Sequence, residues 1–244
     1  MFEPLLSAVL PEVGLGLPRD VAVGGARIDA LLTQTAVASG AVALLLTGVL
    51  LLGALRRARQ AAPARPRSTL IAALAIFAAI DGNLLVRGDV GQSRAEASAP
   101  VIQFEVNAHQ WAWDVRAPGA DGRFGTPDDV VVLNEMVVPV GQPVDVELAS
   151  VDVVHGFSVP NLRIKADAVP GQITHLTFAV AEEGDYEIAC AQHCGLNHYK
   201  MRGVLHAVST TAYREWRDRE SRQALAADDP ADVRAHWAWP WGVP

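Results

Sequence analysis

The sequence predicts a mostly β protein, in which a β-sandwich domain is preceded by a two-helix transmembrane hairpin. Two observations support this fold class. Residues 30–55 contain no charged side chain, and such a run is long enough to cross a bilayer as a helix. From residue 101 onward, short runs of alternating apolar residues are separated by Gly, Pro, Asn and Asp, a pattern typical of strands in a sandwich or barrel.

The hairpin is expected over residues 30–87. Its first span is residues 30–55; the alternative, a buried helix of a soluble core, fits poorly because the uncharged run is long for one. A second apolar run at residues 68–86 contains Asp81, which we expect to face protein or water, or to lie at the membrane interface.

The link between the two spans, residues 56–67, carries five arginines and no acidic residue. Cytoplasmic loops of membrane proteins are enriched in such basic residues, so this link is expected in the cytoplasm. Residues 1–29 then form an outer N-terminal segment. Both termini and everything after about residue 88 are expected on the outer, periplasmic side of a bacterial inner membrane.

The outer part of the chain divides into a β domain at residues 98–210 and a C-terminal region at residues 211–244. Alternating runs such as "VIQFEV" and "PVDVELA" mark the strands. After Ser209, "TAYREWRDRESRQALAA" predicts an amphipathic helix, and the tail "HWAWPWGVP" is rich in tryptophan. This tail is expected either to dock on a partner or at the membrane interface, or to pack on its own domain.

The charge argues against nucleic-acid binding, and the cysteine content argues against a disulfide-stabilised fold. The net charge of −7 is opposite to the basic surface that nucleic-acid binding requires, so no nucleic acid is expected as a partner. The two cysteines are too few for a disulfide framework.

Both cysteines lie in "CAQHCGLNHYKM", residues 190–201. A disulfide would suit an oxidising outer compartment but gives no reason for the neighbouring His198 and Met201. Zinc would accept cysteine and histidine, yet a methionine thioether is a poor zinc ligand. Two thiols, an imidazole and a thioether form a set typical of copper, and two thiolates can bridge two copper ions. A histidine from a distant strand would complete the set, and His155 in "DVVHGFSVP" is the best candidate.

These motifs resemble subunit II of the haem-copper cytochrome c oxidases, and the resemblance covers residues 101–208. Three stretches carry it: the Cys-x-x-x-Cys-Gly-x-x-His-x-x-Met pattern at 190–201, "DVVHGFSVPNLRIKADAVPG" at 152–171, and "HQWAWDV" at 109–115. A two-helix hairpin in front of the outer domain also fits this family.

The resemblance implies a Greek-key cupredoxin fold with a binuclear copper (CuA) centre. The implied metal ligands are His155, Cys190, Gln192 through its backbone carbonyl, Cys194, His198 and Met201. The two cysteines would bridge both copper ions, the first histidine and the methionine would complete one copper, and the other two ligands would complete the second.

The resemblance also implies a function and partners. Trp111 matches the tryptophan through which electrons enter from cytochrome c, whereas Trp113 is expected to pack in the core. The chain would be a non-oxygen-binding subunit of a terminal oxidase, and the haem-bearing subunit I would reduce oxygen. Two alternatives remain: the equivalent subunit of a membrane nitric oxide reductase, and a membrane-anchored protein that binds or delivers copper.

The chain departs from the family pattern at two places. Gln192 stands where many members have a glutamate that helps to bind magnesium at the contact with subunit I. The second apolar run lacks the family's Glu-x-x-Trp-Thr-x-x-Pro type of sequence, and no glutamate occurs between Glu12 and Glu96. The magnesium site and the proton entrance are therefore expected to differ.

Overall fold

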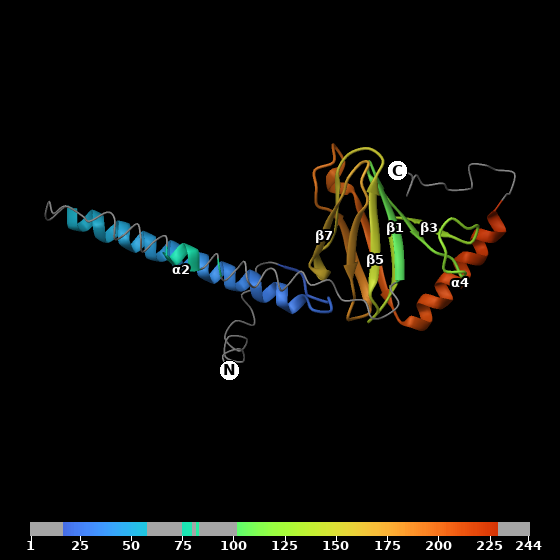
Figure 1. Ribbon diagram of the computed structural model, residues 1–244, viewed down its shortest axis with the longest axis horizontal. Coiled ribbons are helices and arrows are strands. Elements are labelled where there is room, and N and C mark those ends of the chain that lie inside the picture. Colours follow the sequence, from blue (N-terminus) through green and yellow to red (C-terminus); the bar gives the residue numbers. More distant parts are fainter. Residues whose placement is uncertain (1–16, 58–74, 80–81, 83–101, 229–244) are drawn as a thin grey trace. The chain divides into compact units, whose positions relative to one another are not determined.

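The computed structural model describes residues 17–57, 75–79, 82 and 102–228 (Figure 1). These residues fall into two compact units, one holding the long apolar helix and the other the β domain. The Arg-rich link beyond residue 57 and the Trp-rich tail lie outside the described residues. Of the second expected span, 68–86, residues 75–79 and 82 are described and are helical.

The first expected span forms one continuous helix, α2 (Gly25–Arg57). The most apolar stretch of Gly25–Leu55 has a mean hydropathy of 2.2 and no buried residues. Gly25–Leu55 is the one helix in the described part of the chain that is long and apolar enough to cross a membrane. A soluble-core helix would bury one face, so its exposed apolar surface fits a lipid environment.

The β domain is a sandwich of two five-stranded sheets, as the alternating sequence pattern predicts. The first sheet has the order β3-β2-β1-β5-β8. Its strands are β1 (Ile102–His109), β2 (Ala112–Ala117), β3 (Val130–Leu133), β5 (Val144–Ser150) and β8 (Thr174–Phe178). The second sheet has the order β4-β10-β9-β6-β7. Its strands are β4 (Glu135–Pro139), β6 (His155–Val159), β7 (Ile164–Ala168), β9 (Gly184–Cys190) and β10 (Arg202–Val208).

The connections of this sandwich confirm the cupredoxin-like arrangement. The chain crosses repeatedly from one sheet to the other, and strands distant in sequence pair in parallel, β1 with β5 and β4 with β10. The side chains that alternate inward form the core between the sheets, for example Phe104, Val146 and Leu205, which are fully buried. Trp113 is also fully buried, so its expected core role is confirmed.

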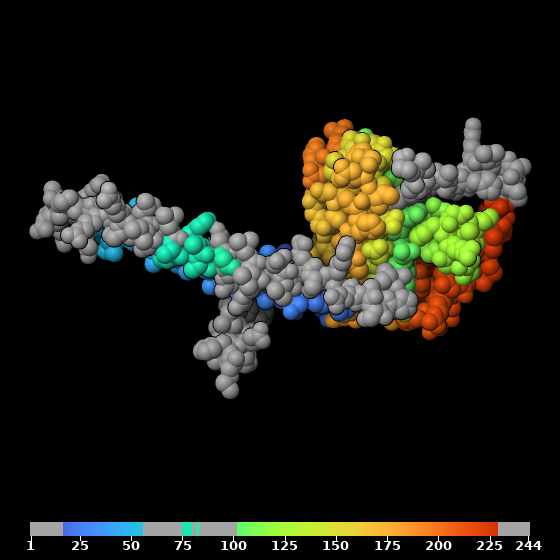
Figure 2. Space-filling view, viewed as in Figure 1, coloured from blue at the N-terminus to red at the C-terminus, as the bar shows by residue number. Residues whose placement is uncertain are grey.

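The expected amphipathic helix is α4 (Thr210–Ala227), and it packs on the β3 and β4 edges of the sandwich. Its start is capped by Ser209, whose hydroxyl accepts a hydrogen bond from the backbone N–H of Ala212 at 3.2 Å. Tyr213 is buried against the domain. Figure 2 shows the loop between β2 and β3 beside this helix, so α4 is part of the β domain.

A short N-terminal strap, residues 17–23, also belongs to the β domain, which the sequence did not predict. Ala22 forms an antiparallel bridge with Val180, and Val21 donates a backbone hydrogen bond to Asn161 at 3.0 Å. The side chain of Val21 is 4% exposed, so the strap is packed as well as hydrogen-bonded.

The strap therefore stabilises a domain that begins some eighty residues later in the sequence. We expect Val21→Ser to lower the free energy of unfolding of the β domain by about 2 kcal/mol, because it removes buried apolar surface and buries a hydroxyl. Thermal unfolding of the full chain in detergent, followed by tryptophan fluorescence, measures this loss. Val23→Ser is the matched control, since Val23 is 62% exposed and should change stability little. Equal losses in the two variants would contradict the packing of Val21.

Candidate metal centre

The pairing of β6 with β9 brings the distant histidine to the cysteine-bearing loop. Phe157 pairs with Cys190 in this antiparallel ladder, and the backbone N–H of Ala191 donates to Gly156 O at 2.8 Å. His155, the first residue of β6, therefore lies across from the start of the loop. Glycine is required at 156, because an added Cβ would lie 2.9 Å from the backbone nitrogen of Gln192.

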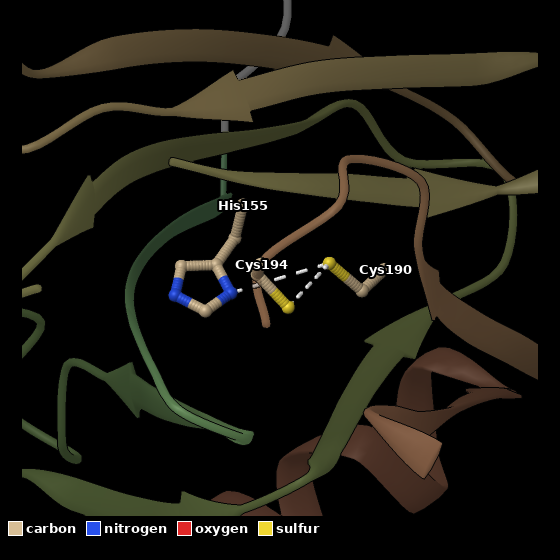
Figure 3. A group of neighbouring side chains, drawn as sticks. All are labelled: His155, Cys190 and Cys194. Carbon is tan, nitrogen blue, oxygen red and sulfur yellow. Dashed lines mark hydrogen bonds between the residues drawn. The ribbon is translucent and has the colours of Figure 1, made fainter. Parts of the chain in front are cut away.

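The two cysteine sulfur atoms face each other and the His155 ring (Figure 3). They lie 3.7 Å apart and are free thiols, so a disulfide is absent from this pair. Nδ1 of His155 is 4.0 Å from the sulfur of Cys190 and 3.1 Å from the sulfur of Met201. His155, Cys190 and Cys194 form a cluster whose potential ligand atoms lie within 4.8 Å of one another.

The remaining predicted ligands flank the same pair of sulfur atoms. Nδ1 of His198 lies 3.6 Å from the sulfur of Cys194, and the sulfur of Met201 lies 3.8 Å from it. The backbone oxygen of Gln192 is 3.2 Å from the sulfur of Cys190. The structure thus brings all six predicted ligands together, with one imidazole on each side of the thiol pair.

This donor set fits copper. Thiolates, imidazoles and a thioether are soft or intermediate ligands, which suit copper better than hard cations such as magnesium. His155, Cys194 and Met201 are almost completely buried, with 0%, 3% and 1% exposure. A buried cluster of free thiols and a thioether is suited to holding a metal ion away from water.

Asp152 orients His155 by contacting the ring nitrogen that faces away from the thiols. Its Oδ1 atom lies 2.8 Å from Nε2 of the ring, which leaves Nδ1 directed at the sulfur atoms. Partial burial opposes the charge of Asp152, but hydrogen bonds from His155 and from the backbone of Val153 and Gln110 hold the pKa of its carboxyl below the usual range. Burial likewise opposes a charged His155 ring, yet its hydrogen bonds to Cys190 and Asp152 raise the pKa of the imidazole.

The predicted electron-entry residue, Trp111, packs against the loop at Gly195. A Cβ added at Gly195 would lie 2.7 Å from Nε2 of Gln110 and 3.4 Å from Nε1 of Trp111. Gly195 also has a φ of +118°, which other residues rarely adopt. The turn between β1 and β2 is therefore in close contact with the segment that carries Cys194.

Two residues of the site were missed by sequence reasoning. The side chain of Gln110 donates a hydrogen bond to the backbone oxygen of Cys194, whereas the sequence analysis singled out only Trp111 and Trp113 in this stretch. Asp152 was not predicted to contact a ligand residue, and its carboxylate contacts His155. An acid three residues before a candidate ligand histidine was the available signal, because metal-binding histidines usually have such a partner.

The two thiols differ in acidity without metal. Burial opposes the Cys190 thiolate, but hydrogen bonds from His155 and from the backbone of Gly156 and Gln192 favour it and lower the pKa to about 6. Burial and the neighbouring Cys190 raise the pKa of Cys194 to about 12. At neutral pH the metal-free site therefore holds one thiolate, on Cys190.

We expect alkylation of the metal-free chain by iodoacetamide to modify Cys190 first. Its rate should rise with pH through about 6 and then level off, because the thiolate is the reactive form and an unperturbed cysteine would rise through about 8.5. Mass spectrometry of chains labelled at a series of pH values measures both sites. In His155→Gln the midpoint should move upward. A midpoint near 8.5 in the unmodified sequence would contradict the interaction with His155.

A two-sheet sandwich with clustered cysteine, histidine and methionine ligands in the loops at one end defines a cupredoxin-like metal-binding domain. Comparison with known proteins identifies the kind of domain. Residues 103–208 match the family model for the periplasmic domain of cytochrome c oxidase subunit II, so this part of the chain is a domain of that kind. A domain of this kind implies copper binding, and the group of His155, Cys190 and Cys194 is consistent with it.

Curated relatives agree with this assignment. The chain is 34% identical over 161 residues to the alternative cytochrome c oxidase subunit 2 of Bradyrhizobium diazoefficiens, covering 57% of this chain and 58% of that protein. It is 28% identical over 146 residues to cytochrome c oxidase subunit 2 of a Synechocystis species, covering 60% of this chain and 39% of that protein. The chain thus spans well under two thirds of the length of these relatives.

Among solved structures, the periplasmic domain of cytochrome oxidase subunit II from Bradyrhizobium japonicum is similar. It has 23% sequence identity and a TM-score of 0.45, and the match covers 50% of this chain and 94% of that chain.

Proposed function

We propose that this chain is the electron-entry subunit of a membrane terminal oxidase and holds a binuclear copper centre. The observation that carries this proposal is the pair of facing thiols, 3.7 Å apart, with His155 on one side and His198 on the other. Two thiolates so placed are suited to bridging two metal ions. His155 and Met201 then complete one copper, and His198 with the Gln192 carbonyl completes the other.

The protein's contribution to electron transfer is to hold these ligands still. A binuclear copper centre held by these residues would supply one-electron chemistry. His155 is fixed by Asp152, Gly156 lets the loop approach β6 closely, and Gly195 lets it approach Trp111. Ligand segments held this firmly resist rearrangement when the charge of the metal site changes. Trp111, which contacts the loop, is the proposed entry point for electrons.

The arrangement favours electron transfer over other uses of copper. A catalytic metal needs an open position for substrate, whereas six protein ligands here surround the space between the thiols. A copper-delivery protein would need an exchangeable site, which a buried ligand set disfavours. In our proposal oxygen is reduced in a partner, the haem-bearing subunit I; an equivalent role in a nitric oxide reductase is the second candidate, since the same ligand set would serve there.

The N-terminal strap supports the proposed hairpin topology. Residues 17–23 are hydrogen-bonded to the β domain, so both lie on the same side of any membrane that α2 crosses. In our proposal, the second span of the hairpin returns the chain to this side of the membrane. We infer that both flanks of the hairpin, with the copper domain, lie on the periplasmic side.

The end of the domain around the site suggests the character of the electron donor. Among the described residues at this end, three apolar or aromatic side chains are highly exposed: Val151 at 62%, Leu196 at 85% and Tyr199 at 66%. The carboxylate of Asp152, at this end of the domain, is engaged with His155. We propose that the donor is a small redox protein, such as a cytochrome c, that docks through an apolar face with few charges.

The copper centre is tested by adding copper to the reduced full chain in detergent. We expect a purple species whose electron paramagnetic resonance spectrum shows one electron shared by two copper nuclei. Cys194→Ser and His198→Gln should abolish this pattern, whereas the control His193→Gln should keep it, because His193 is an exposed neighbour outside the ligand set. A colourless chain, or a shared-electron spectrum that survives Cys194→Ser, would refute the proposal.

The donor surface is tested with the purified oxidase complex and its reduced donor. We expect the oxidation rate to change less than about threefold between low and physiological ionic strength, because charge-steered docking would make it fall steeply. Leu196→Ser should lower the rate about tenfold, as loss of a central apolar contact does in protein interfaces. Leu225→Ser, at an exposed leucine of α4, is the control. A steep salt dependence would contradict an apolar docking face.

A further inference from the structure

A hydrogen-bonded bridge connects the two metal-ligand segments across the open end of the sandwich. Its centre is Gln110, in the turn between β1 and β2. The side-chain Nε2 of Gln110 donates to the backbone oxygen of Cys194 at 2.8 Å. The backbone N–H of the same residue donates to Oδ2 of Asp152 at 2.7 Å. One residue thus binds both the cysteine loop and the loop before the histidine strand.

The second half of the bridge runs from Asp152 to the predicted ligand. Oδ1 of Asp152 lies 2.8 Å from Nε2 of His155, while its Oδ2 accepts from Gln110. The two oxygens of one carboxylate are therefore shared between the turn and the ligand ring. The backbone N–H of Val153 also donates to Oδ1, at 2.6 Å, which fixes the carboxylate itself.

The bridge links the two sheets of the sandwich. Gln110 follows β1, and Asp152 follows β5, both strands of the first sheet; Cys194 and His155 are placed by β9 and β6 of the second sheet. The spacing between the ligand segments and Trp111 is not set by the β6–β9 ladder, because Trp111 belongs to the other sheet. The two hydrogen bonds of Gln110 connect these segments across the two sheets.

We propose that Gln110 and Asp152 are positioning residues, which hold His155 and the Cys194 segment in register with each other and with Trp111. Neither side chain is a metal ligand. Asp152 acts through the ring of His155, and Gln110 acts through the backbone of Cys194. The role of these residues in electron transfer rests on the proposed function. The hydrogen bonds themselves are present without metal.

The bridge to His155 is tested first in the metal-free full chain. With ¹⁵N-labelled histidine in detergent, the Nε2–H of His155 should give a resonance protected from exchange with water, identified by its loss in His155→Gln. Asp152→Ala should abolish the protection, and Asp152→Asn should retain part of it, because an amide oxygen still accepts. The control is Asp185→Asn, which alters a second Asp–His contact of 2.7 Å, to His206, away from the site. Unchanged protection in Asp152→Ala would overturn the proposal.

The effect on the metal centre is then measured with copper. Loss of an outer-shell partner typically weakens metal affinity about 10- to 100-fold, and we expect this for Asp152→Ala and Gln110→Ala in competition with a copper chelator. Both variants should also change the hyperfine pattern and the reduction potential. Gln103→Ala, at an exposed glutamine of β1, is the control and should match the unmodified chain.

The two experiments separate failure of the bridge from failure of the proposed function. If the unmodified chain forms no binuclear copper centre, the proposed function fails, while the metal-free resonance still decides whether Asp152 holds His155. If the centre forms and both alanine variants match the control in affinity, spectrum and potential, the positioning role is overturned and the proposed function stands.

Discussion

The antiparallel pairing of β6 with β9 is the constraint on which the rest of the site depends. It places His155 beside a loop that begins thirty-five residues later, because Phe157 pairs with Cys190. Successive side chains of a strand point to opposite faces, so a register shift of one residue would turn the His155 ring away from the thiols. The ladder is therefore what turns a set of suitable side chains into one cluster, and Gly156 allows the loop to follow it closely.

The chemistry of the cluster follows from its burial. The cysteine thiols and the methionine thioether are weakly hydrated groups that lose little on leaving water, whereas a buried imidazole needs a partner. Asp152 is that partner, and it directs Nδ1 of His155 at the sulfur atoms. A site built in this way favours a soft metal held in a fixed geometry, and that is the requirement for passing electrons with little rearrangement.

Two segments outside the two sheets, residues 17–23 and α4, pack on the β domain. The strap of residues 17–23 adds a backbone bridge and the buried Val21 to the second half of the sandwich, and α4 covers the β3 and β4 edges. In the chain, the strap immediately precedes α2.

The sequence alone was sufficient for features that depend on near neighbours. The uncharged run of α2, the alternation of the strands and the spacing of Cys190, Cys194, His198 and Met201 within one loop are all local patterns, and His155 was found through its motif. The tertiary structure decided which distant groups meet. The strap on Val180, the carboxylate of Asp152 on His155 and the amide of Gln110 on Cys194 join segments whose contact is set by sheet register and by the packing of the two sheets. No local periodicity encodes such contacts, because hydrogen bonds between remote segments depend on how the whole sandwich closes.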